Sequence, residues 1–197
     1  MNPSIENPFR IVFAVLWVIY FGSRLYFQRR IKGSLEYTRI NERQEIVLFR
    51  LFAIAFLLLP LYFLTDWIDF ASLPLPLWLR WSGGLTTCVG MVLFNWSHQA
   101  LGRNWTAVLA LSNEHEMVQS GPYRYVRHPM YSSFFVLGIG FWLLSANWLI
   151  AATYLLPLSV MYGVRVSLEE KMMADRFGES YRQYMMHTGR LFPQFWR

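Results

Sequence analysis

Two short clusters of polar and aromatic residues carry the side chains that could do chemistry. The first runs from Gly121 to Tyr131 (Gly-Pro-Tyr-Arg-Tyr-Val-Arg-His-Pro-Met-Tyr) and places two Arg, one His and three Tyr directly before an apolar run. The second begins at Arg165, just after another apolar run, and contains the adjacent carboxylates Glu169 and Glu170. Together they offer cations, anions, an imidazole and phenols at the ends of apolar segments.

The first cluster has the features of a ligand site at the start of a helix. Pro129 biases His128 away from helical geometry, so a helix is predicted to begin at or just after His128. The exposed N–H groups and partial positive charge of that helix end suit a carboxylate. His128 could bond a polar group, and Tyr123 and Tyr131 could stack on a ring or face a cation. The residues alone leave an interfacial aromatic belt, with Arg meeting lipid phosphates, equally open.

The second cluster contains a helix-start pattern. Ser167-Leu-Glu-Glu170 matches the Ser-x-x-Glu capping box, with Ser167 at N-cap and Glu170 at N3. This interpretation gives Glu170 a structural role and leaves Glu169 to face a ligand; it fails if the helix runs unbroken from the preceding apolar segment. Apolar residues then recur at helical spacing and predict an amphipathic helix that lies on the membrane interface or covers the site: Leu168, Met172, Met173, Phe177, Tyr181, Tyr184 and Met185.

The composition indicates a membrane protein. The 197 residues are 55% hydrophobic and 18% aromatic, only 15% are charged, and the mean hydropathy is +0.27. A soluble domain has about a quarter charged residues. The net charge of +6 does not indicate nucleic acid, because the bases are not gathered on one soluble face. The one cysteine, Cys88, is predicted to be a small buried packing residue. His98 and His187 have no metal-ligand spacing, so they are expected at the membrane interface and no metal is expected.

Apolar runs predict an all-α membrane domain, residues 1–197, with about five spans. Residues 9–27, 46–64 and 77–97 are near the ~20 residues that a span needs. Their internal arginines, Arg24, Arg50 and Arg80, are expected to reach the interface. Residues 130–145 and 148–164 are shorter and form a tight hairpin at Ala146 and Asn147, where Asn tolerates a left-handed backbone. Sixteen residues reach only about 24 Å, so the hairpin is either two spans or re-entrant.

Charge predicts the orientation. The loop from Thr65 to Pro76 carries Asp66 and Asp69 and no base, whereas the loops on either side of it in the chain, and the tail, are rich in Arg and Lys. By the positive-inside rule the N-terminus is outside and the C-terminus cytoplasmic. Residues 98–129 and 165–197 are then cytoplasmic segments that carry both clusters, in a cell inner membrane or endoplasmic reticulum.

No glycine-rich phosphate or dinucleotide loop is present. Gly83-Gly84 and Gly138-Ile-Gly140 lie inside apolar runs, and they are predicted to let helices approach closely. Any cofactor site must therefore be built in another way.

The two clusters resemble those of the isoprenylcysteine carboxyl methyltransferase family, integral-membrane enzymes that use S-adenosylmethionine and share much of the pattern with phospholipid N-methyltransferases. The resemblance covers about residues 91–197, including Leu101-Gly-Arg-Asn-Trp105 and Thr188-Gly-Arg-Leu-Phe-Pro193. It implies that Arg165 and Glu169 are catalytic, with Arg165 holding the acceptor's carboxylate. It implies cofactor contacts at Val108, His115, Glu116, Met117, Val118, Tyr123, His128, Pro129, Met130, Tyr131 and Glu169. Ser133 stands where the family often has Gly, which puts the identity of the acceptor in doubt.

The resemblance implies methyl transfer from S-adenosylmethionine to a lipophilic acceptor, with membrane lipids as further partners. Arg165 favours the carboxylate of a prenylcysteine-like acceptor, because an arginine opposes an ammonium. The alternatives are a phospholipid or small-amphiphile N- or S-methyltransferase, an enzyme like the membrane sterol reductases, and a non-catalytic membrane protein.

Overall fold

Long, nearly parallel and antiparallel helices make up most of the computed structural model, which describes residues 3–31, 37–39, 42–104, 110–112 and 116–194. The helices are α1 (Pro3–Ile31), α2 (Glu42–Leu58), α3 (Leu61–Leu64), α4 (Leu77–Leu101), α5 (Pro129–Ser145), α6 (Trp148–Phe177) and α7 (Glu179–His187). Single 3-10 turns are η1 (Asp69–Ala71), η2 (Gly102–Asn104) and η3 (Gly121–Arg124). The all-α prediction therefore holds apart from β1 (Tyr37–Arg39) and β2 (Ala110–Ser112), which pair antiparallel with Thr38 opposite Leu111.

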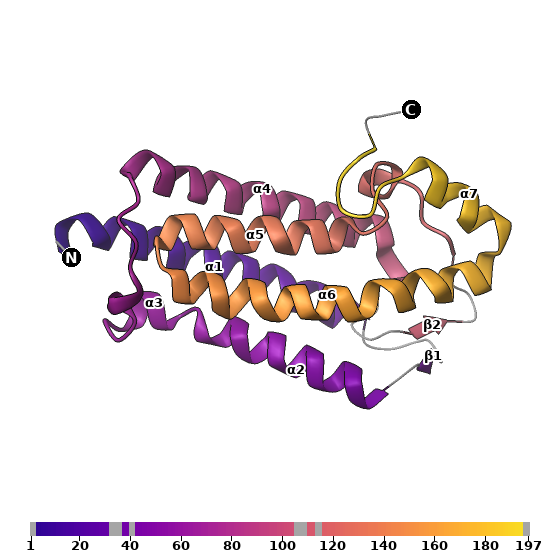
Figure 1. The fold of residues 1–197 in the computed structure, drawn as a ribbon, viewed down its shortest axis with the longest axis horizontal. Coiled ribbons are helices and arrows are strands. Elements are labelled where there is room, and N and C mark those ends of the chain that lie inside the picture. The colour runs from indigo at the N-terminus through magenta and orange to yellow at the C-terminus, as the bar shows by residue number, and fades with distance from the viewer. Residues whose placement is uncertain (1–2, 32–36, 40–41, 105–109, 113–115, 195–197) are drawn as a thin grey trace.

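The helices run along the long axis of the molecule, with α7 and the two strands at one end and α3 at the other (Figure 1). Among the described residues, two segments are long and apolar enough to cross a membrane: Ile5–Arg29 within α1, and Trp148–Phe177. The apolar run over residues 46–64 is divided at Leu59 and Pro60 into α2 and α3. Proline has no N–H to donate to the preceding turn, which explains the break.

Glycines allow α5 to pack closely between α4 and α6. A Cβ on Gly83 would lie 2.4 Å from the backbone nitrogen of Leu144, and one on Gly140 would lie 2.4 Å from Oγ1 of Thr87. On the other face of α5, a Cβ on Gly138 would meet the ring of Tyr154 at 2.6 Å. No larger side chain fits at these distances, so the prediction of close helix approach is confirmed for Gly83, Gly138 and Gly140. It is not confirmed for Gly84, where a Cβ would lie 3.7 Å from Cδ1 of Leu144.

The turn between α5 and α6 is held by its own two residues. Ala146, not Asn147, takes the left-handed conformation, with φ at 49°. Asn147 instead caps α6, because its Oδ1 accepts from the N–H groups of Leu149 (3.0 Å) and Ile150 (3.2 Å). Its Nδ2 donates to the carbonyl of Ile68 at 2.8 Å and so ties the turn to the loop before α4.

A buried ion pair at this end of the bundle corrects one expectation. Arg80 does not reach toward the interface; its guanidinium is buried and donates to both carboxylate oxygens of Glu6, at 2.6 and 2.9 Å. The guanidinium also lies 3.7 Å from the centre of the Phe9 ring, and its Nε donates to the carbonyl of Leu144. The pair therefore joins the starts of α1 and α4 to the end of α5.

The structure also corrects the prediction for the cysteine. Cys88, expected to be buried, is exposed on α4.

Removing one partner of this pair should destabilise the fold strongly. Arg80→Met leaves Glu6 as an unpaired buried charge, which costs about 3–5 kcal/mol. We expect a lower midpoint of thermal unfolding in detergent, with much of the loss restored in an Arg80→Met/Glu6→Gln double variant. Arg50→Met, at an exposed arginine, is the matched control. Unfolding of Arg80→Met at the wild-type temperature would contradict this role.

Candidate active site

The segment before α5 is folded so that the first cluster meets the end of the bundle. Gly121 has a positive φ of 59° and packs against Trp96 and Ala100 of α4, so a side chain here would be strained. The η3 turn, which begins at this glycine, buries Tyr123. Pro129 is the first residue of α5, with His128 in non-helical geometry before it, which confirms the predicted helix start.

The second cluster lies on a helix that does not break. α6 continues for 30 residues from Trp148 to Phe177, and the chain turns only at Gly178. The interpretation of Ser167 as an N-cap is therefore wrong, since Ser167 lies exposed in the interior of α6. Glu169 and Glu170 nevertheless have different surroundings, because consecutive residues of an α-helix project about 100° apart.

The imidazole of His128 lies between these two carboxylates. Its Nδ1 is 3.5 Å from Oε2 of Glu169, and its Nε2 is 3.3 Å from Oε1 of Glu170. Burial alone lowers the pKa of His128, but the hydrogen bonds and negative charges of the two glutamates outweigh it. The pKa of His128 is therefore raised above its ordinary value. This arrangement favours the imidazolium form, in which both ring nitrogens donate.

Glu169 is the centre of a group drawn from both clusters. The hydroxyl of Tyr131 donates to its Oε1 at 2.9 Å, and Nη2 of Arg165, one helical turn earlier, lies 3.5 Å from the same oxygen. Glu169 keeps 23% of its side chain exposed, whereas Arg165 and Tyr131 are buried. Burial, and then the charge of Glu169, raise the pKa of Tyr123 well above its ordinary value, so this phenol also lies within the field of the group. Glu169 is thus a partly accessible carboxylate surrounded by hydrogen-bond donors.

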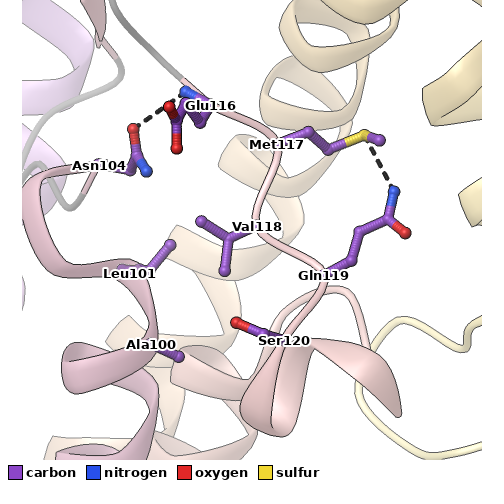
Figure 2. Close-up of a pocket in the computed structure, with 8 residues that line it drawn as sticks. All are labelled: Ala100, Leu101, Asn104, Glu116, Met117, Val118, Gln119 and Ser120. Carbon is purple, nitrogen blue, oxygen red and sulfur yellow. Dashed lines mark hydrogen bonds between the residues drawn. The ribbon is translucent and has the colours of Figure 1, made fainter.

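The remaining sequence-predicted residues fall in two places. Pro129 and Met130 form the first turn of α5. Glu116, Met117 and Val118 line a pocket of about 580 Å³ against the end of α4 and η2 (Figure 2). His115 and Val108 lie outside the described residues.

The pocket adds residues that sequence reasoning did not assign. Asn104 accepts a hydrogen bond from the N–H of Glu116 at 3.1 Å, and Gln119 donates to the sulfur of Met117 at 3.5 Å (Figure 2). Ala100, Leu101 and Ser120 complete the lining. In the sequence, Asn104 was indicated only by its place in Leu101-Gly-Arg-Asn-Trp105, a stretch that resembles the family.

The pocket and the group around Glu169 are connected by one continuous segment. Residues 116–131 form in turn the pocket wall, η3 and the start of α5, which carries Tyr131.

Glu170 belongs to a second set of contacts that was also missed. It accepts from Nε of Arg127 at 2.9 Å and from Nη2 of Arg190 at 2.7 Å. Arg190 lies in the Thr188–Pro193 stretch, for which the sequence indicated a family resemblance but no role.

Across the described residues no group of three His, Cys, Asp or Glu side chains could hold a metal ion. His98, expected at the interface, is buried, and its ring lies between those of Phe27 (4.5 Å) and Phe94 (4.2 Å).

The position of His128 predicts a pH dependence of stability. Because its pKa is raised in the folded state, its stabilising contribution is complete below the unfolded pKa of about 6.5 and is lost as pH rises through the folded value. We expect the thermal midpoint of the wild type to fall with rising pH more steeply than that of His128→Gln. His187→Gln, at an exposed histidine of α7, serves as the control. Parallel pH curves for wild type and His128→Gln would refute the prediction.

Comparisons with known proteins identify relatives of similar sequence and one similar fold. The model of the isoprenylcysteine carboxyl methyltransferase (ICMT) family matches residues 84–175. A probable protein-S-isoprenylcysteine O-methyltransferase of Oryza sativa subsp. indica is 25% identical over 182 residues, which are 90% of this chain and 93% of that protein. The protein-S-isoprenylcysteine O-methyltransferase of Schizosaccharomyces pombe is 31% identical over 99 residues, which are 49% of this chain and 42% of its own.

A solved structure shares the fold. It is that of the eukaryotic intramembrane Ras methyltransferase ICMT, with a TM-score of 0.55 and 24% identity, and the match covers 78% of this chain and 54% of that one. The matched family segment contains η3, α5 and the part of α6 that bears Arg165, Glu169 and Glu170. Through this segment, the chain is similar to the isoprenylcysteine carboxyl methyltransferase family.

Proposed function

We propose that the protein transfers a methyl group from S-adenosylmethionine to the carboxylate of a lipophilic, prenylcysteine-like acceptor. The observation that carries the proposal is the grouping of His128, Tyr131, Arg165 and Glu169 at one end of an apolar helix bundle. The names of the relatives, protein-S-isoprenylcysteine O-methyltransferases, support the class of acceptor.

The residues present fit the cofactor. S-adenosylmethionine supplies an activated methyl on a sulfonium, together with an α-ammonium, a ribose and an adenine. The partly exposed carboxylate of Glu169 suits the cationic groups, and the phenol of Tyr131 orients that carboxylate. The 580 Å³ pocket lies within the range of about 300–1,000 Å³ that is usual for small-molecule sites, and it offers both apolar and polar walls for a nucleoside.

Arg165 determines the class of acceptor in this proposal. A carboxylate is ionised at neutral pH and needs no base, whereas an amine arrives protonated and needs one. The guanidinium of Arg165 is buried, so its charge is weakly screened and favours an anionic acceptor over an ammonium. With Arg165 and Glu169 one turn apart on the rigid α6, the acceptor and the donor would be aligned by one helix. Such alignment can contribute about 7–11 kcal/mol.

We also propose that five segments span the membrane, with α7 and the clusters on the cytoplasmic side of a cell inner membrane or endoplasmic reticulum. Exposed apolar side chains along α1, α2 and α4 support contact with lipid, among them Val18, Leu57 and Val92. At the end opposite α7, Trp67 and Trp78 are 78% and 71% exposed, as in an interfacial aromatic belt. The positive-inside bias supports the orientation.

Titration calorimetry with S-adenosylhomocysteine tests the cofactor. We expect saturable binding by the detergent-purified wild type. Glu169→Gln should weaken it by roughly 10- to 100-fold, the range for loss of one charged hydrogen bond. Glu179→Gln, at an exposed carboxylate on α7, is the control and should bind as the wild type does. Absence of binding by well-folded wild type would sink the methyltransferase proposal.

A second measurement tests the acceptor. Arg165→Met should abolish methyl transfer to an S-prenylcysteine while it lowers S-adenosylhomocysteine affinity much less than Glu169→Gln does, because Arg165 reaches the cofactor site only through its contact with Glu169. Equal losses of cofactor affinity in the two variants would place Arg165 in the cofactor site instead. Arg176→Met, exposed further along α6, provides the control. Faster methylation of phosphatidylethanolamine than of the prenylcysteine by the wild type would favour the N-methyltransferase alternative.

A further inference from the structure

The C-terminal strap, residues 188–191, follows α7 and is bonded to the chain just before α5. The N–H groups of Arg127 and His128 donate to the carbonyls of Gly189 (2.8 Å) and Arg190 (3.0 Å). The hydroxyl of Ser132 donates to the carbonyl of Leu191 at 2.7 Å. The backbone around His128 therefore takes its position from the strap as well as from α5.

Side chains reinforce the same connection. Arg127 donates through Nη1 to the carbonyls of Met185 and Thr188, and through Nε to Glu170. Arg190 of the strap donates through Nε and Nη2 to Glu170, at distances down to 2.7 Å. Glu170 has only 9% of its side chain exposed. It pairs with Arg127 from the segment before α5 and with Arg190 from the strap, and it also faces His128.

We propose that Glu170, Arg127 and Arg190 are positioning residues that hold the imidazole of His128, and through it the carboxylate of Glu169, in the geometry that binds the cofactor. The inference rests on the proposed function. Nε2 of His128 is directed at Glu170, which leaves Nδ1 directed at Glu169. Without Glu170 held in place, the ring has no second partner on α6 to fix its rotation.

The positioning also concerns Arg165. Glu169 contacts His128, Tyr131 and Arg165. If His128 turned away, Glu169 would lose one of these three contacts, and its position beside Arg165, the group proposed to hold the acceptor, would be less fixed.

Arg190 is the member to vary, because α7 is attached to the rest of the molecule by other side chains. α7 is attached through Tyr184, whose hydroxyl donates to the carbonyl of Tyr123 at 2.5 Å, and Thr188 donates to the carbonyl of Tyr184 at 2.6 Å. The side chain of Arg190 is 51% exposed. Its removal therefore leaves the buried contacts of α7 in place.

The test compares Arg190→Met, Arg190→Lys and the control Arg182→Met, whose ion pair with Glu179 is exposed on both sides. In Arg190→Met we expect the Kd for S-adenosylhomocysteine and the KM for S-adenosylmethionine to rise about tenfold, equal to about 1.4 kcal/mol. The kcat at saturating cofactor should stay within about twofold of wild type. Arg190→Lys should recover most of the affinity, and Arg182→Met should match the wild type. Wild-type affinity in Arg190→Met, or equal losses in kcat and in affinity, would overturn the inference.

Hydrogen exchange without cofactor gives an independent readout. The amides of Arg127 and His128 should exchange faster in Arg190→Met than in the wild type or in Arg182→Met, because their acceptors lie on the strap. Unchanged exchange in Arg190→Met would overturn the inference even if no cofactor were bound. Failure of the wild type to bind S-adenosylhomocysteine would instead count against the proposed function, so the two failures are distinguishable.

Discussion

His128 lies between the carboxylates of two consecutive residues of one helix, and this placement depends on several other features of the structure. α6 must continue without a break to present Glu169 and Glu170 side by side. α5 must begin at Pro129, so that His128 remains outside the helix and can reach both. A cation between two anions is stabilised in a poorly solvated setting only when its geometry is maintained, and three separate chain segments maintain it here.

The bundle behind the site is built for rigidity. Glycines bring α5 into backbone contact with α4 and against the ring of Tyr154 on α6, and dense contacts of this kind transmit small shifts instead of absorbing them. At the far end, the buried charges of Arg80 and Glu6 join α1 and α4 to the carbonyl of Leu144 at the end of α5. The close packing of Gly138 against Tyr154 limits how far α5 and α6 move relative to each other, and the ion pair fixes the end of α5 to α1 and α4.

Much of this arrangement could be predicted from local sequence, and the remainder is tertiary. The start of α5 follows from Pro129, whose effect on His128 is local, and the close helix approach follows from glycines in apolar runs. The capping box at Ser167 failed because Ser-x-x-Glu occurs inside helices as well as at their starts. Arg80 was misjudged because its partner Glu6 lies 74 residues away, and no local pattern connects them. For the same reason the pairing of Arg190 with Glu170 could not be read from spacing.

The turn at Ala146 and Asn147 has a mechanical consequence for the site at the other end of the bundle. It is the only covalent junction between α5 and α6, and it is anchored to Ile68 and, through the N–H of Leu73 at 2.6 Å, to the loop before α4. α5 has 17 residues and is about 26 Å long, so a rotation of about 2° at this pivot displaces His128 by about 1 Å. A misplacement of about 1 Å can lower a rate about 100-fold. Together with the packing along α5, the angular stiffness of a two-residue turn therefore limits the displacement of groups a full helix length away.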